Sequence, residues 1–167
     1  QLMPIYRISR PANPTLADEY IAFQSPTGNI HCSLYDWDGT ATVRCDLRQY
    51  VPTYTKAPPN CEYDWGMSYA VESAGKGYLA CVSDSMVDPG NPVLPYGEAV
   101  SMGGISCVSA KTGMTCTNAE GHGFSVAKAK QSCRANPSER NAHNRIAIDA
   151  TIISATTPAN TIASRSA

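Results

Sequence analysis

Apolar and polar residues alternate along residues 28–47 with the two-residue period of a β-strand, interrupted around Gly39. The pattern predicts two strands joined as an antiparallel hairpin. The apolar positions are Ile30, Cys32 and Leu34 in the first strand and Val43, Cys45 and Leu47 in the second. Placing Cys32 opposite Cys45 puts all six on one face, and directly opposed residues are close enough for a disulfide. Residues 37–40 are then predicted to form the loop.

Residues 103–118 repeat this scheme. Cys107 placed opposite Cys116 leaves residues 110–113 as a loop that ends in a glycine. The second hairpin is shorter by an even number of residues in each strand, so its cysteines stay on the same face as the apolar residues. We therefore predict a second disulfide across this hairpin.

The remaining cysteines follow a different pattern. A turn at residues 74–77 is predicted to join a strand at 67–73 to a strand at 78–83, and in that register Cys81 faces Ala70. Cys61 must then approach from the proline-rich segment APPNC, so we predict that Cys61 and Cys81 form a disulfide between a loop and a strand. Cys133 is left as the odd thiol. It is either a buried or capped single cysteine, or the site of an intermolecular disulfide.

Turn clusters separate short strands throughout this region, and no apolar run with a helical period is present. The predicted fold is all-β, a disulfide-stapled antiparallel sandwich or open barrel with extended N- and C-terminal arms. The arms are residues 1–19 and 134–167, and the stapled domain is residues 20–133. The second arm alternates apolar and polar residues around Ile146, Ile148 and Ile152, which predicts one strand that pairs with a sheet edge.

Composition narrows the function classes. The chain has 13 Lys plus Arg against 14 Asp plus Glu and no basic run, which argues against nucleic-acid binding. No apolar run is long enough to cross a bilayer, so we expect no membrane insertion. The seven cysteines and three histidines do not have metal-ligand spacing, so we expect structural disulfides, no metal and no cofactor. Disulfides and a chain that opens at Gln1 predict a secreted, extracellular or periplasmic protein.

Candidate catalytic residues are few, and no nucleophile elbow, zinc-protease, phosphate-loop, dinucleotide or EF-hand motif occurs. The DWDG segment at residues 36–39 is interpreted as a hairpin tip, because it lacks the further ligands of a calcium loop. His122 lies between two glycines in EGHGF and could act as a base if the fold brought Asp64, Trp65 or Asp84 to it. A turn at the entry to a strand is the simpler interpretation.

Several longer strings resemble those of an uncharacterised family of small exported bacterial cysteine-rich domains. They are FQSPTGNIHC, VRCDL, CEYDWG, GYLACVSD, LPYGEAV and ISCVSAKTGMTCTNAEGHGFSVAK, within residues 23–130. The resemblance implies six disulfide-forming cysteines, Cys32, Cys45, Cys61, Cys81, Cys107 and Cys116, and it brings no known activity. By the same resemblance, Cys133 and both arms lie outside the matched region.

These observations predict an exported, non-enzymatic structural or interaction protein, a subunit of an extracellular filament, coat or surface lattice. Its β-strand arms would join copies of itself or another assembly protein through an interface at Ile146, Ile148 and Ile152. One alternative is a monomeric secreted or periplasmic binding or inhibitor module. A second alternative is a hydrolase that uses His122.

Overall fold

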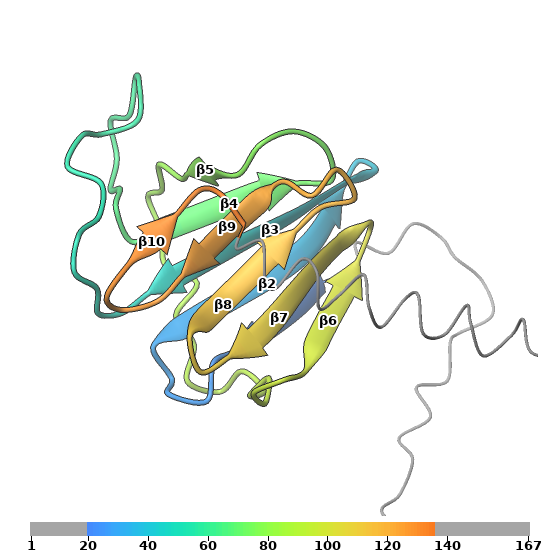
Figure 1. Ribbon diagram of the computed structural model, residues 1–167. Helices are drawn as coiled ribbons and strands as arrows, with labels where there is room; N and C mark the ends of the chain where they lie inside the picture. Colours follow the sequence, from blue (N-terminus) through green and yellow to red (C-terminus); the bar gives the residue numbers. More distant parts are fainter. Residues whose placement is uncertain (1–19, 136–167) are drawn as a thin grey trace, which may run out of the picture.

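The computed structural model describes residues 20–135, which form two antiparallel sheets packed face to face without a helix in that range (Figure 1). Sheet 1 has the order β1-β2-β3-β4-β5, and sheet 2 has the order β10-β9-β8-β7-β6. The strands of sheet 1 are β1 (Tyr20–Gln24), β2 (Ile30–Trp37), β3 (Thr40–Leu47), β4 (Ser68–Glu72) and β5 (Tyr78–Leu79). Those of sheet 2 are β6 (Ala99–Met102), β7 (Ile105–Ala110), β8 (Gly113–Thr117), β9 (Gly123–Val126) and β10 (Gln131–Ser132). The fold is therefore the predicted all-β sandwich and not a closed or open barrel.

Both disulfide hairpins have the predicted register, with Cys32 opposite Cys45 and Cys107 opposite Cys116. Their turns are shorter than predicted. Trp37 pairs with Thr40, so only Asp38 and Gly39 form the first turn, with φ values of 52° and 80°. Two central residues with positive φ characterise a type I′ turn, which matches the twist of the flanking strands and favours an Asp-Gly pair. In the second hairpin Ala110 pairs with Gly113 across a two-residue turn, so the predicted four-residue loops are wrong at both sites.

The inner faces of the two sheets form one core. Its largest buried members are Phe23, Ile30, Leu34, Val43, Leu47, Tyr69 and Val71 from sheet 1 and Met102, Ile105, Met114, Phe124 and Val126 from sheet 2. The disulfides Cys32–Cys45 and Cys107–Cys116 meet at its centre, where the Sγ atoms of Cys45 and Cys116 are 3.9 Å apart. The third disulfide, Cys61–Cys81, joins the loop before β4 to the segment after β5. These are the three pairs that the sequence predicts.

The pairing of β4 with β5 differs from the prediction. Ala70 lies opposite Tyr78 and not opposite Cys81, and β5 ends two residues before that cysteine. The cause is contact with the other sheet. The side-chain amide of Asn118, in the β8–β9 turn, donates to the backbone carbonyl oxygens of Glu72 and Gly75 at 3.0 and 2.8 Å. This contact holds the chain after β4 in a longer connection than the tight turn that was predicted at residues 74–77.

Residues 82–94, here called the strap, cross the outer face of sheet 1. The side chain of Gln24 on β1 donates to the carbonyl oxygens of Pro89 and Asn91, and its backbone pairs with the strap at Pro92 and Leu94. Buried His31 accepts a hydrogen bond from the Asp88 amide at Nδ1, 3.3 Å away, which leaves Nε2–H to donate to the Gly28 carbonyl at 3.0 Å. The strap thus covers polar residues that would otherwise face solvent.

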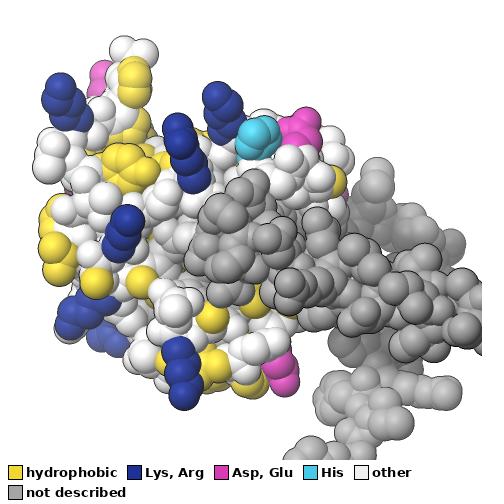
Figure 2. Space-filling view, viewed as in Figure 1, with side chains coloured by type: hydrophobic (Ala, Val, Ile, Leu, Met, Phe, Trp, Pro, Cys, Tyr) yellow, Lys and Arg dark blue, Asp and Glu magenta, His cyan; other side chains and the backbone are white. Residues whose placement is uncertain are grey.

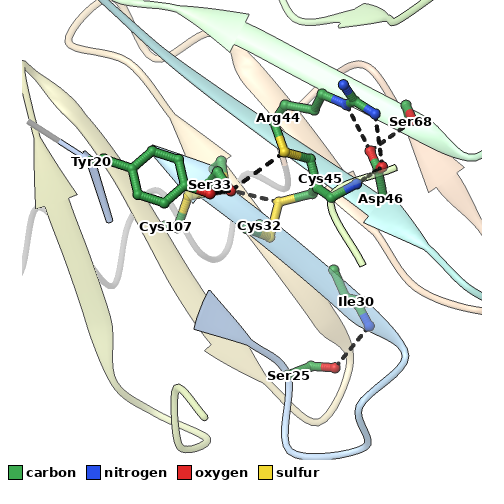
Figure 3. The surroundings of a disulfide bond; sticks show 12 residues. Tyr20, Ser25, Ile30, Cys32, Ser33, Arg44, Cys45, Asp46, Ser68 and Cys107 are labelled. Atoms are coloured by element: carbon green, nitrogen blue, oxygen red, sulfur yellow. Dashed lines mark hydrogen bonds and ion pairs between the residues drawn. A yellow bond between two sulfur atoms is a disulfide. The ribbon is translucent and has the colours of Figure 1, made fainter. Parts of the chain in front are cut away.

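Arg44 and Asp46 on β3 form a buried ion pair, shown with Ser68 in Figure 3, and this pair also binds the strap. Arg44 donates to both carboxylate oxygens of Asp46, at 2.9 and 2.8 Å, and Ser68 adds a third hydrogen bond at 2.7 Å. The amide of Met86 in the strap donates the fourth, at 2.8 Å. Arg44 also binds the side chain and backbone carbonyl of Asp84, and this guanidinium holds the pKa of Asp84 below its ordinary value. The polar atoms of Arg44 and Asp46 are thus already hydrogen-bonded within the protein. These two residues therefore have a structural role, which is to link the strap to β3.

Candidate functional site

A cleft of about 390 Å³ opens between the two sheets at one end of the sandwich. Several turns form it, among them β1–β2, β7–β8 and β9–β10, which lie together at that end (Figure 1). Its lining residues are Ser25, Thr27, Gly28, Asn29 and Ile30; Arg48 and Gln49; Tyr96; Ala110, Lys111 and Gly113; and Ala127 and Lys128. Cavities of about 300–1,000 Å³ commonly hold small ligands, so this cleft is the candidate site.

The string SPTGNI builds one wall of the cleft. Ser25 closes the β1–β2 turn with its backbone amide on the Ile30 carbonyl, and its hydroxyl accepts from the Ile30 amide at 3.1 Å. Gly28 supplies a φ of 67° within that turn, a backbone region that is costly for most other residues. The amide group of Asn29 then pairs with the Gln49 backbone through two hydrogen bonds of 2.9 Å. The turn therefore positions the segment that follows β3, including Arg48.

The charged side chains in the cleft all carry the same sign. Arg48, Lys111 and Lys128 line it, all three are exposed, and none of the described residues that line it is Asp or Glu. The Lys128 ammonium is held 3.0 Å from the side-chain oxygen of Gln49. Lys and Arg side chains are spread over the face seen in the space-filling view, and some of them lie toward its lower left, the end where these turns lie (Figure 2). Like charges around a concave surface concentrate the positive potential there, so the cleft favours an anionic group.

The rest of the lining is mixed, with polar side chains at Ser25, Thr27, Asn29 and Gln49 beside a few apolar or aromatic ones. Ala110 and Ala127 contribute small apolar surfaces and Tyr96 contributes an exposed ring, whereas Ile30 is buried in the core. The arrangement suits a ligand that presents an acidic group beside an apolar one. Sequence reasoning missed Arg48, Lys111, Lys128 and Tyr96 as a group, because they belong to separate segments of the chain. The sequence strings SPTGNI and KTG could have indicated the cleft, because the segments that carry them form two of its walls.

His122 is exposed and lies in the β8–β9 connection, directly before β9. Its backbone amide donates to the side-chain oxygen of Asn118 at 3.1 Å, and its backbone carbonyl accepts from the backbone amide of Asn118 at 2.8 Å. Within residues 20–135 its hydrogen bonds do not involve Asp64, Trp65 or Asp84, the partners considered from the sequence. Asp84 instead pairs with Arg44. These contacts fit a turn that enters β9 and give the hydrolase prediction no support.

Cys133 is a free thiol just after β10. It is half-buried, packs against the core, and its amide donates to the Tyr54 hydroxyl at 2.9 Å. Burial raises the pKa of this thiol above its ordinary value. Because the thiolate is the reactive form, the surroundings favour an unreactive single cysteine. The intermolecular disulfide considered from the sequence stays a prediction.

The Cys133 thiol is expected to react with a disulfide reagent such as DTNB about tenfold more slowly at pH 7.5 in the folded protein than in the protein unfolded by guanidinium. The rate should continue to rise as the pH passes the ordinary thiol value of 9.0, because the folded protein forms its thiolate only at higher pH. Cys133→Ser is the control for labelling elsewhere. Rapid labelling at neutral pH, or a dimer linked through Cys133 on non-reducing electrophoresis, would contradict the expectation.

The arms are predicted at residues 1–19 and 134–167; all of the first and residues 136–167 of the second, with Ile146, Ile148 and Ile152, lie outside the described residues. Among residues 20–135, β6 is the terminal strand of sheet 2 and has no strand paired on its outer side. No group of three or more metal-ligating side chains occurs in this part of the chain. A search of the same residues for a helix long and apolar enough to span a bilayer also finds none.

Comparison with known proteins gives one match. No curated protein and no solved structure is significantly similar. The sequence profile of a family of unknown function, DUF6636, matches residues 3–134. The match is wider than the predicted resemblance over residues 23–130, and it takes in Cys133 and most of the N-terminal arm, which were expected to lie outside. The chain belongs to the family of unknown function DUF6636.

Proposed function

We propose that this chain is an exported binding domain whose end cleft recognises a ligand through an acidic group. The observation that carries the proposal is the set of three cationic side chains, Arg48, Lys111 and Lys128, around a cleft whose described lining includes no carboxylate. The β-sandwich serves as the rigid frame. Binding residues on loops held by such a frame are a common arrangement in proteins.

Export is supported by the cysteines. Three disulfides occur in a domain of modest size, and two of them lie fully buried at its centre. Such bonds form and persist in oxidising compartments such as the extracellular space and the periplasm. The domain therefore suits a location in which its ligand is a surface, envelope or extracellular component.

The cleft also limits the kind of ligand. Its charges are exposed, so binding should be weakened by salt, and a small ion alone should bind weakly. The apolar wall at Ala110 and Ala127 and the ring of Tyr96 favour a ligand with an apolar or aromatic part beside its acid. The subunit role through the arms concerns residues outside the described part and stays a prediction.

Inorganic phosphate and citrate are suitable probes in a titration followed by NMR of the uniformly labelled protein. We expect amide shifts concentrated at residues 27–30, 111–113 and 128, with a Kd on the order of millimolar at low salt. The variant Arg48→Ala/Lys111→Ala should bind about tenfold more weakly, because two of the three cations are removed.

Lys56→Ala is the matched control, since Lys56 is exposed but does not line the cleft. Its titration should resemble that of the wild type. Shifts spread evenly over exposed lysines, or equal binding by the double variant and the wild type, would contradict the proposed site.

A further inference from the structure

We propose that the cleft receives the β2–β3 turn of a second copy of this chain, so that copies associate head to tail. The inserted element is the tip, defined as residues 36–40, which contains Trp37 between Asp36 and Asp38. The inference rests on the proposed function, because it identifies the acidic ligand of the cleft. It also uses the DWDG segment, whose backbone forms the hairpin turn while the Trp37 side chain stays exposed.

The tip has the features of an interface anchor. The side chain of Trp37 is 68% exposed although it is a large aromatic group at the end of a strand. Its backbone is rigid, because the hairpin is paired from Ile30 to Trp37 and closed by the Cys32–Cys45 disulfide. A preorganised tryptophan loses little conformational entropy when it is buried, and tryptophan is among the residues enriched at binding hot spots.

The chemistry of the tip matches that of the cleft. The tip carries one aromatic ring and two carboxylates, whereas the cleft has three cations around an apolar wall and the ring of Tyr96. Its volume of about 390 Å³ is sufficient for one indole ring. Placing Trp37 against the apolar wall would bring Asp38, the next residue along the turn, within reach of cations on the rim, whereas the side chain of Asp36 lies on the opposite face of the strand.

The two surfaces lie at opposite ends of one hairpin. Ile30 begins β2 and Arg48 follows β3 at the cleft, while the tip joins the other ends of these strands (Figure 1). An eight-residue strand is about 25 Å long, so the tip cannot enter the cleft of its own copy. Each copy therefore offers one tip and one cleft, which is a heterologous interface. Interfaces of this type form open chains or closed rings, depending on the rotation between copies.

Sedimentation velocity of the full chain, from about 1 μM to about 1 mM, tests the association in the range expected for a small, weak interface. We expect wild-type protein to form dimers and larger species as the concentration rises, and to dissociate as salt is added. Trp37→Ala should weaken association by about 30-fold or more, in keeping with a hot-spot residue. Tyr63→Ala is the matched control, because Tyr63 is 63% exposed but is not in the tip.

A mixing experiment distinguishes this geometry from other dimers. Trp37→Ala removes the tip and leaves the cleft, whereas Arg48→Glu/Lys111→Glu reverses charges in the cleft and leaves the tip. Each variant alone should be monomeric. An equimolar mixture should form a heterodimer that grows no further, because only one productive tip and cleft remain per pair. Thermal unfolding of each variant establishes that it is folded.

The outcomes separate the inference from the proposed function. Wild-type protein that stays monomeric at about 1 mM but binds citrate in the cleft would overturn the inference and leave the anion site standing. Association that survives in both variants would also overturn it, since the copies would then be joined elsewhere, for example through the arms. Absence of both citrate binding and association would overturn both proposals.

Discussion

Replacing Asp46 with alanine is expected to lower the free energy of unfolding by about 3–5 kcal/mol, the range for breaking one partner out of a buried ion pair. Asp46 is 2% exposed and accepts hydrogen bonds from Arg44, Ser68 and the Met86 amide. Its loss leaves the Arg44 guanidinium, whose side chain is 9% exposed, without its main buried partner. It also removes the hydrogen bond from the Met86 amide, one of the contacts that hold the strap on β3.

Guanidinium denaturation followed by circular dichroism measures this effect, and Asp84→Ala is the matched control. Asp84 binds the same guanidinium, but its side chain is 69% exposed, so its loss should cost less than about 1 kcal/mol. The pKa of Asp84 is lowered by Arg44, so its small contribution is present at neutral pH and is lost as the pH falls below the ordinary value of 3.8. Equal losses in the two variants would show that burial of the Asp46 pair is unimportant.

Removing the Cys32–Cys45 disulfide by a double substitution to alanine is expected to cost about 4–5 kcal/mol. Restriction of the unfolded chain accounts for about 3 kcal/mol of this for a loop of this length. The remainder, about 1–2 kcal/mol, comes from the cavity left by two sulfur atoms in the core. Both cysteines are fully buried, and the Sγ atom of Cys45 lies 3.9 Å from that of Cys116 in the other sheet.

The Cys61–Cys81 disulfide provides the comparison. Its sequence separation is 20 residues against 13 for Cys32–Cys45, so chain entropy alone would make it slightly the more stabilising of the two. Cys81 is exposed, however, and its removal leaves no cavity in the core. We therefore expect the Cys61→Ala/Cys81→Ala variant to lose about 3 kcal/mol, less than the Cys32→Ala/Cys45→Ala variant. The opposite order in denaturation midpoints would show that packing between the two central disulfides contributes nothing.

Much of the fold could be predicted because its main signals are local. Side chains in a strand alternate between two faces, so the positions of Cys32 and Cys45 among apolar residues specify one register and one disulfide. The same reasoning holds for Cys107 and Cys116. It erred at the turns, where Trp37 and Thr40 extend the strands, because alternation does not show where pairing stops.

Less of the candidate site could be predicted. His122 drew attention because it lies between glycines, yet the structure uses its backbone to close a turn on Asn118. The cleft residues Arg48 and Lys111 are ordinary surface residues in the sequence, and nothing near either of them in the chain indicates the other. Their positive charges are recognised as one feature only when the fold shows that the two segments lie side by side at the cleft.

The sequence by itself determined the period-two strands, the disulfide pairs and the all-β class, because each depends on residues a short distance apart in the chain. The tertiary structure decided the pairing of β4 with β5, where Asn118 of the other sheet holds the connection open. It also decided the cationic cleft and its separation from the Trp37 tip. Those features arise from packing one sheet on another, which brings together turns that are distant along the chain.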